Sequence, residues 1–130
     1  RQAEEISAFI LKKLAGQAEI HTGEKVTDVV ITVPAYFDSA RRDATQTAGV
    51  LAGFNVHELV PEPTAAAIAY ETSSHENQTI LVYDLGGGTF DTTVINISDT
   101  DIEVVCTGGD AKLGGRLWDE RILGYLEDIL

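Results

Sequence analysis

The 130-residue sequence contains a single cysteine, Cys106, and no methionine. One cysteine excludes an internal disulfide bond and is typical of a protein in a reducing compartment. Because Cys106 lies in an apolar stretch, we expect a buried and chemically inert thiol. No apolar run approaches the ~20 residues that a membrane-spanning helix needs, and the sequence has no signal-peptide pattern. These absences predict a cytoplasmic protein.

Basic residues are also scarce, with 9 Lys and Arg against 21 Asp and Glu and a net charge of −12. Nucleic acids and anionic membranes require a basic face, so the composition argues against both as partners. Any bound phosphate must be held by backbone dipoles, a metal ion and a few local cations against an adverse overall field. A chain of 130 residues, 44% of them apolar, is long enough for one domain with a real core.

The most distinctive stretch is the octapeptide DLGGGTFD, from Asp84 to Asp91. It lies between two runs that are typical of β-strands, 79–83 and 91–97, which predicts a hairpin with successive glycines in its turn. Such a turn is open to positive φ and keeps Cβ atoms out of the way. Its successive backbone N–H groups can form a concave nest for a phosphate. Since the flanking carboxylates would repel a phosphate, the pattern predicts Mg²⁺ with oxygen ligands between them.

Other interpretations of this stretch fit less well. A dinucleotide-binding fingerprint needs a third glycine where the sequence has Asp91, and it opens a helix rather than a strand. A Walker loop needs Gly-Lys followed by Ser or Thr, which the sequence does not contain. A flexible glycine hairpin without a ligand remains an alternative. Asp84, Thr89 and Asp91 around the glycines favour a Mg-nucleotide phosphate loop over that alternative.

Hydrophobic periodicity predicts alternating helices and strands in residues 1–76. The expected elements are a helix to about Gly16, a polar connector at 17–25, a strand at 27–34, a helix from Asp38 or Ser39 to Gly53, a strand at 55–60, and a short helix from Pro63 to about Tyr70. The strand at 27–34 is expected to be buried on both faces because its apolar residues are continuous rather than alternating.

The pattern changes to a β-meander in residues 77–130, after a polar connector at 71–78. The expected elements are strands at 79–83, 91–97 and 102–107, a glycine-rich loop at 108–115, and a final helix from about Leu117. We therefore expect two parts, residues 1–76 and 77–130, neither of which is closed by itself.

Four motifs together resemble the nucleotide-binding domain of the DnaK-type heat-shock chaperones, the 70-kilodalton class. They are VPAYF at 33–37, EPTAAA at 62–67, DLGGGTFD at 84–91 and GGD…LGG at 108–115. Their order and spacing fit along essentially the whole chain, which is similar to the middle third of that domain. The resemblance implies an α/β fold of the actin-like, ribonuclease-H-like kind, with ATP in the cleft between two lobes. Residues 1–76 then match the later part of the first lobe, and residues 77–130 the start of the second.

The resemblance also implies roles for individual residues. Asp84 matches a catalytic carboxylate that positions the water shell of Mg²⁺ and the attacking water, and Glu62 matches a glutamate near them. Residues implied in binding ATP or ADP are Gly86, Gly87, Gly88, Thr89, Asp91, Gly114 and Gly115. Pro34 and Arg42 resemble a proline switch and its arginine, which relay the nucleotide state. From the residues alone, Pro34 also fits a simple strand end, and Glu62 a favourable charge at a helix N-terminus.

The implied partners of the full-length protein are a J-domain co-chaperone, a nucleotide exchange factor and unfolded polypeptide. The sequence departs from the family pattern at Glu58 and Pro61, in a region that contributes to J-domain contact. It also has Arg116 and Leu117 where the family has two acidic residues beside the cleft. These departures indicate a divergent member and put the co-chaperone surface in doubt.

We therefore expect the parent protein to be a slow ATPase that couples ATP turnover to the binding and release of unfolded polypeptides. The family's first phosphate loop and its catalytic lysine precede the segment that Arg1 begins. The 130-residue chain alone is thus expected neither to hydrolyse ATP appreciably nor to bind it tightly. Two alternatives stay open, namely a kinase of the actin-like superfamily and a non-catalytic fragment that self-associates.

Overall fold

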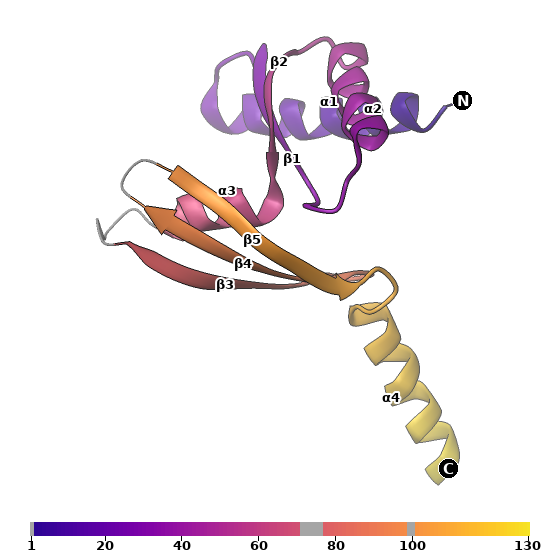
Figure 1. The fold of residues 1–130 in the computed structure, drawn as a ribbon. Coiled ribbons are helices and arrows are strands. Elements are labelled where there is room, and N and C mark those ends of the chain that lie inside the picture. The colour runs from indigo at the N-terminus through magenta and orange to yellow at the C-terminus, as the bar shows by residue number, and fades with distance from the viewer. Residues whose placement is uncertain (1, 71–76, 99–100) are drawn as a thin grey trace. The chain divides into compact units, whose positions relative to one another are not determined.

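The computed structural model describes residues 2–70, 77–98 and 101–130 (Figure 1). Contacts divide the chain into two compact units, Arg1–Ala65 and Ala66–Leu130, and each unit is described by itself. Helices and strands alternate in the first unit, and a meander sheet dominates the second. The chain is therefore a mixed α/β structure, as the sequence predicts.

The first unit contains α1 (Ala3–Thr22), β1 (Asp28–Val33), α2 (Ser39–Leu51) and β2 (Asn55–Pro61). β1 and β2 pair in parallel, and their register runs from Asp28 opposite Asn55 to Val33 opposite Pro61. Parallel neighbours need a crossover connection. α2 supplies it and packs against both strands, while α1 packs against α2 (Figure 1).

The ends of α2 confirm the expected capping residues. Asp38 is the N-cap, and its carboxylate accepts a hydrogen bond of 2.9 Å from the backbone N–H of Arg41. At the other end Gly53 has a φ of 93°, the left-handed conformation that glycine adopts without strain. The helix that carries the crossover is thus terminated by local chemistry at both ends.

The first helix is longer than expected, because α1 continues through Gly16 to Thr22. Gln17, Ala18 and Glu19 all favour helix, and one interior glycine costs only about 1 kcal/mol relative to alanine. The helix ends where Gly23 takes a φ of 75° and donates a 2.8 Å hydrogen bond to the carbonyl of Glu19. The expected polar connector therefore shrinks to the residues after this glycine.

β1 is not buried on both faces, contrary to the expectation for its continuous apolar run. Its residues alternate between exposed and covered, so that Val33 is 1% exposed whereas Val30 is 59% exposed. α2 covers one face of the two-stranded sheet, and the described residues leave Val30 on the other face uncovered. A continuous apolar run indicates that a strand tends to be buried, but it does not identify which element covers each face of the strand.

The second unit contains the meander of β3 (Gln78–Leu85), β4 (Phe90–Ser98) and β5 (Asp101–Asp110), followed by α4 (Gly115–Ile129). The strand order β3-β4-β5 is antiparallel throughout, which confirms the expected meander. α3 (Glu62–Tyr70) begins in the first unit and contributes Ala67 to the core of the second. Members of this core are Ala67, Ile95 and Ile97, with Ile80, Val82 and Ile102 packed against them.

One expectation for the second unit is wrong. Cys106 is exposed on β5, because no described element covers this side of the edge strand, so its thiol is not buried. The final helix begins at Gly115, within two residues of the expected start near Leu117, and Gly114 serves as its extended N-cap. Within the described residues no helix is both long enough and apolar enough to cross a membrane.

Gly49→Ala should lower the free energy of unfolding by about 1–3 kcal/mol, the usual range for overpacking. A Cβ at Gly49 would overlap Cγ2 of Val56 and lie 3.0 Å from Cδ1 of Ile31, so α2 would have to move off the sheet. Urea unfolding followed by circular dichroism measures the effect. Gly16→Ala is the matched control, because a Cβ there meets no described atom within 4 Å and should stabilise α1 by about 0.5–1 kcal/mol. Equal effects of the two variants would contradict the close approach of α2.

Candidate functional site

The glycine stretch forms the expected hairpin turn between β3 and β4. Asp84 pairs with Asp91 and Leu85 with Phe90, and the N–H of Gly86 donates a 2.9 Å hydrogen bond to the carbonyl of Thr89. Gly87 and Gly88 therefore occupy the tip. None of the three glycines has a positive φ, so left-handed conformation is not the reason for glycine here.

The structure brings Gly114 and Gly115 against this turn. The N–H groups of Gly115 and Arg116 donate hydrogen bonds of 3.0 Å to the carbonyls of Gly86 and Gly87, respectively. A Cβ on Gly114 would lie 2.5 Å from the backbone nitrogen of Gly88, so only glycine fits at this position. The residues predicted to bind nucleotide in the second unit are thus neighbours in space, although their ligand stays a prediction.

Asp84 and Asp91 form a pair of like charges beside the turn. They lie directly opposite each other on neighbouring strands, which puts both side chains on one face of the sheet. Asp91 is half-buried and Asp84 is exposed. Burial, and secondly the Asp84 carboxylate, raise the pKa of Asp91 above its ordinary value. A cation between the two carboxylates would relieve this repulsion.

The described residues contain no complete metal centre, because no group of three or more His, Cys, Asp or Glu side chains is placed to hold an ion. Asp84 and Asp91 supply two carboxylates only. This arrangement suits an ion that keeps most of its water ligands and binds mainly through a phosphate, which is how Mg²⁺ is commonly held.

Glu62 is the first residue of α3 and is half-buried, next to the buried Pro63. Proline in the first turn confirms the expected start of this helix, and an acidic side chain there is favoured by the helix dipole. Glu62 belongs to the first unit and the glycine turn to the second. Its role beside the metal and water stays a prediction.

Pro34 and Arg42, the predicted relay residues, are connected through one residue between them. The N–H of Phe37 donates a 3.1 Å hydrogen bond to the carbonyl of Pro34. The carbonyl of Phe37 in turn accepts a 3.2 Å hydrogen bond from Nε of Arg42, which is half-buried. Sequence reasoning did not identify Phe37 as the link, although its place in VPAYF could have drawn attention to it.

A polar cluster at the start of the parallel strands was also missed. The Asp28 carboxylate accepts hydrogen bonds from the Thr27 hydroxyl and, at 3.2 Å, from Nδ2 of Asn55. It also lies 2.9 Å from Nε2 of His57. The Thr27 hydroxyl, followed by His57 and Asn55, lowers the pKa of Asp28. His57 lies two residues after Asn55, the partner of Asp28, on the same face of the sheet. This pairing depends on the register of the two strands, which cannot be read from the sequence.

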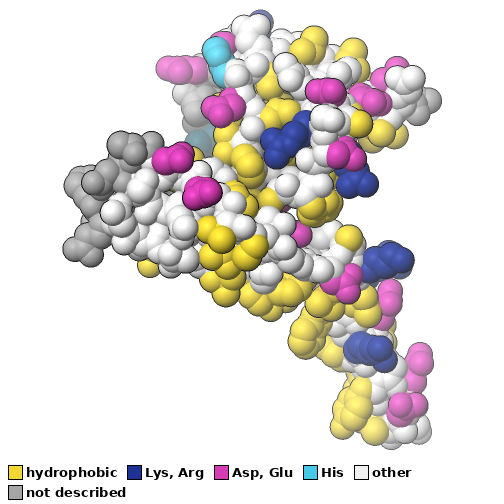
Figure 2. Space-filling model, in the orientation of Figure 1, with side chains coloured by type: hydrophobic (Ala, Val, Ile, Leu, Met, Phe, Trp, Pro, Cys, Tyr) yellow, Lys and Arg dark blue, Asp and Glu magenta, His cyan; other side chains and the backbone are white. Residues whose placement is uncertain are grey.

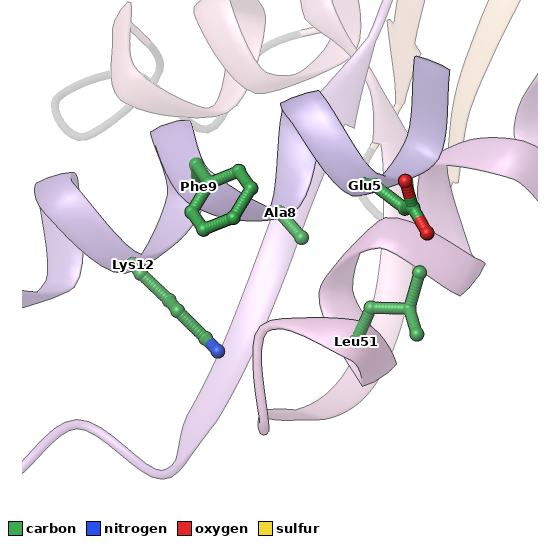
Figure 3. Close-up of a pocket in the computed structure, with 5 residues that line it drawn as sticks. All are labelled: Glu5, Ala8, Phe9, Lys12 and Leu51. Carbon is green, nitrogen blue, oxygen red and sulfur yellow. The ribbon is translucent and has the colours of Figure 1, made fainter. Parts of the chain in front are cut away.

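Two hollows elsewhere on the described surface do not compete with the glycine turn. One, of about 260 Å³, lies between α1 and α2 (Figure 3). Glu5 and Lys12 both line it, so their opposite charges give a polyphosphate no net attraction. The other, of about 420 Å³, lies between α3 and β3 and is lined by Ala66, Ala67, Tyr70, Ile80, Leu81 and Val82. Its side chains are nearly all apolar.

The fold and the site define the class of protein. It is an α/β chain in which two carboxylates flank a glycine hairpin. The family model described as Hsp70 protein matches residues 1–129. The Chaperone protein DnaK of Deinococcus proteolyticus is 51% identical over 125 residues, which are 96% of this chain and 20% of that protein. The chain therefore belongs to the Hsp70 family and spans about a fifth of the length of this curated relative.

Asp84→Asn should lower the pKa of Asp91, because the like charge opposite is removed while the burial remains. A carbon-13 NMR titration of the side-chain carboxyl groups measures it, with Asp101→Asn at the far end of β5 as the control. An unchanged Asp91 pKa would show that the two carboxylates do not interact.

The same variant should change how stability depends on pH. A raised pKa means that the folded chain binds more protons than the unfolded chain, so the Asp91 contribution to the free energy of unfolding falls as pH rises between the unfolded and folded pKa values. That window begins near 3.8 and extends upward. Asp84→Asn should lower the upper end of this pH window. Urea unfolding at several pH values should then show a smaller fall in the free energy of unfolding across the window.

Proposed function

We propose that this chain forms part of the ATPase domain of a chaperone that couples ATP turnover to the binding and release of unfolded polypeptides. The observation that carries the proposal is the match to the Hsp70 family along residues 1–129, with 51% identity to a DnaK chaperone. We further propose that the fold is the actin-like one, that the lobes divide near residues 76 and 77, and that the protein works in the cytoplasm.

In this proposal the glycine turn binds the β- and γ-phosphates of ATP. Gly87 and Gly88 have neither a positive φ nor any described atom within 4 Å of an added Cβ. The fold alone therefore does not require glycine at either position. A ligand that approaches the backbone closely does require it, and a phosphate held by N–H groups is such a ligand. The Thr89 hydroxyl would add one more contact to the phosphates.

Asp84 and Asp91 fit a hydrated Mg²⁺ that accompanies the phosphates. When bound, the ion would neutralise the phosphate charge, which favours phosphoryl transfer to water. The exposed Asp84 would orient its water shell and the attacking water, while Asp91 closes the turn. Gly114 and Gly115 would lie near the nucleotide, behind the turn that holds the phosphates, and Glu62 would act near the metal and water from the start of α3.

The proposal extends to the conformational relay and to the partners of the whole protein. Pro34 and Arg42, joined through Phe37, would pass the nucleotide state toward the part that binds polypeptide. A J-domain co-chaperone and a nucleotide exchange factor would act on the cycle. On β2, Glu58 is exposed and Pro61 is half-buried, and the negative charge of Glu58 would change the preference for a co-chaperone surface.

Titration of Mg·ADP into nitrogen-15-labelled chain tests the phosphate loop. One loop without opposing groups should bind weakly, with a Kd of about 1 mM or above, and amide shifts should be confined to 84–91 and 114–116. Gly87→Val should abolish these shifts because the side chain blocks the approach of the phosphate. Gly16→Ala, in α1, is the control and should leave them unchanged. Shifts that survive Gly87→Val would refute the proposed loop.

Self-association of the chain is a second candidate property, favoured by the apolar face of α4. The exposed apolar side chains on this helix are Trp118, Ile122, Leu123, Tyr125, Leu126 and Ile129. Figure 2 shows hydrophobic side chains along one side of α4 and charged ones on the other. An amphipathic helix without a partner is a common association surface.

Sedimentation velocity over a hundredfold range of protein concentration tests self-association. We expect the sedimentation coefficient to rise with concentration, since apolar burial drives association. Ile122→Glu should shift the chain toward monomer because it places a charge on the apolar face, whereas Glu120→Gln on the same helix should not. A concentration-independent monomer would rule out this property and leave the phosphate loop untouched.

A further inference from the structure

The glycine turn depends on a helix that lies far away in the sequence. Across its tip the turn has the backbone hydrogen bond from the Gly86 N–H to the Thr89 carbonyl, which does not by itself fix the direction of the Gly86 and Gly87 carbonyls. Two further bonds come from α4, where Gly115 and Arg116 donate to the carbonyls of Gly86 and Gly87 at 3.0 Å each. These two bonds fix the direction of both carbonyls.

The direction of a carbonyl also fixes the N–H group that follows it. In a trans peptide the C=O and the next N–H point in opposite directions, and the described chain has no cis peptide. Because the carbonyls of Gly86 and Gly87 point toward α4, the N–H groups of Gly87 and Gly88 point away from it. Two successive N–H groups thus share one side of the turn, which is the arrangement of an anion nest.

Gly114 sets how closely α4 approaches the turn. An added Cβ would lie 2.5 Å from the nitrogen of Gly88 and 2.6 Å from the carbonyl carbon of Gly87. Both are backbone atoms, so no side-chain rotation can relieve the clash. The φ of Gly114 is −177°, which any residue adopts, so space alone excludes a side chain here.

We infer that Gly114 is a positioning residue, which holds the start of α4 against the glycine turn so that the Gly87 and Gly88 amides face a phosphate. This inference rests on the proposed phosphate loop. The end of α4 is not itself the anion site, because its Gly115 and Arg116 amides already donate to the turn. The helix orients the nest without touching the ligand.

Gly114→Ala tests this role, with Gly124→Ala in the same helix as the matched control. A Cβ at Gly124 meets no described atom within 4 Å. In ligand-free protein, Gly114→Ala should speed hydrogen exchange of the Gly115 and Arg116 amides about tenfold, the loss expected for weakened hydrogen bonds. It should also move the nitrogen-15 shifts of Gly87 and Gly88. Gly124→Ala should do neither.

Inorganic phosphate and Mg·ADP are then titrated into both variants. Gly114→Ala should weaken binding about tenfold or more, because free peptides no longer present both amides together. If Gly114→Ala does not fold, Gly115→Pro replaces it, since proline suits the first helical position and replaces the N–H that bonds to Gly86 with a ring carbon, which breaks this bond.

The outcomes separate the inference from the proposed function. Unchanged exchange and unchanged Gly87 and Gly88 shifts in the ligand-free variants would overturn the positioning role, whether or not phosphate binds. If the Gly87 and Gly88 shifts change in Gly114→Ala but its phosphate affinity equals that of the wild-type chain, the positioning role is overturned as well. If the wild-type chain shows no phosphate-induced shifts while both ligand-free effects appear, the positioning of the amides stands and the phosphate loop fails.

Discussion

The close contact between the start of α4 and the turn that joins β3 to β4 is the constraint on which the second unit depends. Glycines at the tip lower the barrier to many conformations, so the turn needs an external restraint to keep one. Gly115 and Arg116 supply it with two backbone hydrogen bonds, and the missing Cβ of Gly114 permits the approach. The same bonds satisfy two of the helix N–H groups that would otherwise lack partners.

Electrostatic repulsion acts on the same turn. The chain carries a net charge of −12, and Asp84 and Asp91 face each other beside the tip. Burial raises the pKa of Asp91, and repulsion by the Asp84 carboxylate raises it further. In the proposed phosphate loop, N–H groups between two carboxylates would favour an anion that brings its own cation over a bare anion.

The sequence predicted the features that depend on neighbouring residues. Asp38 and Gly53 at the ends of α2, Pro63 at the start of α3 and the meander follow from capping, proline geometry and alternation. Features that depend on distant contacts were missed or wrong. The exposure of Cys106 and Val30 depends on which faces other elements cover, and the tight fit of Gly114 on Gly88 joins residues that only the fold brings together.

Helix α4 connects two properties that the sequence presents separately. Its first turn restrains the glycine turn, and its exposed apolar face offers a surface for another protein or another part of one. Any surface that covers this face changes the free energy of α4 in its present position. In the proposed phosphate loop, a partner that moves the start of α4 would change the affinity of the Gly87 and Gly88 amides for phosphate through the bonds of Gly115 and Arg116. Because such coupling is reciprocal, phosphate would then change the affinity of the partner by the same factor.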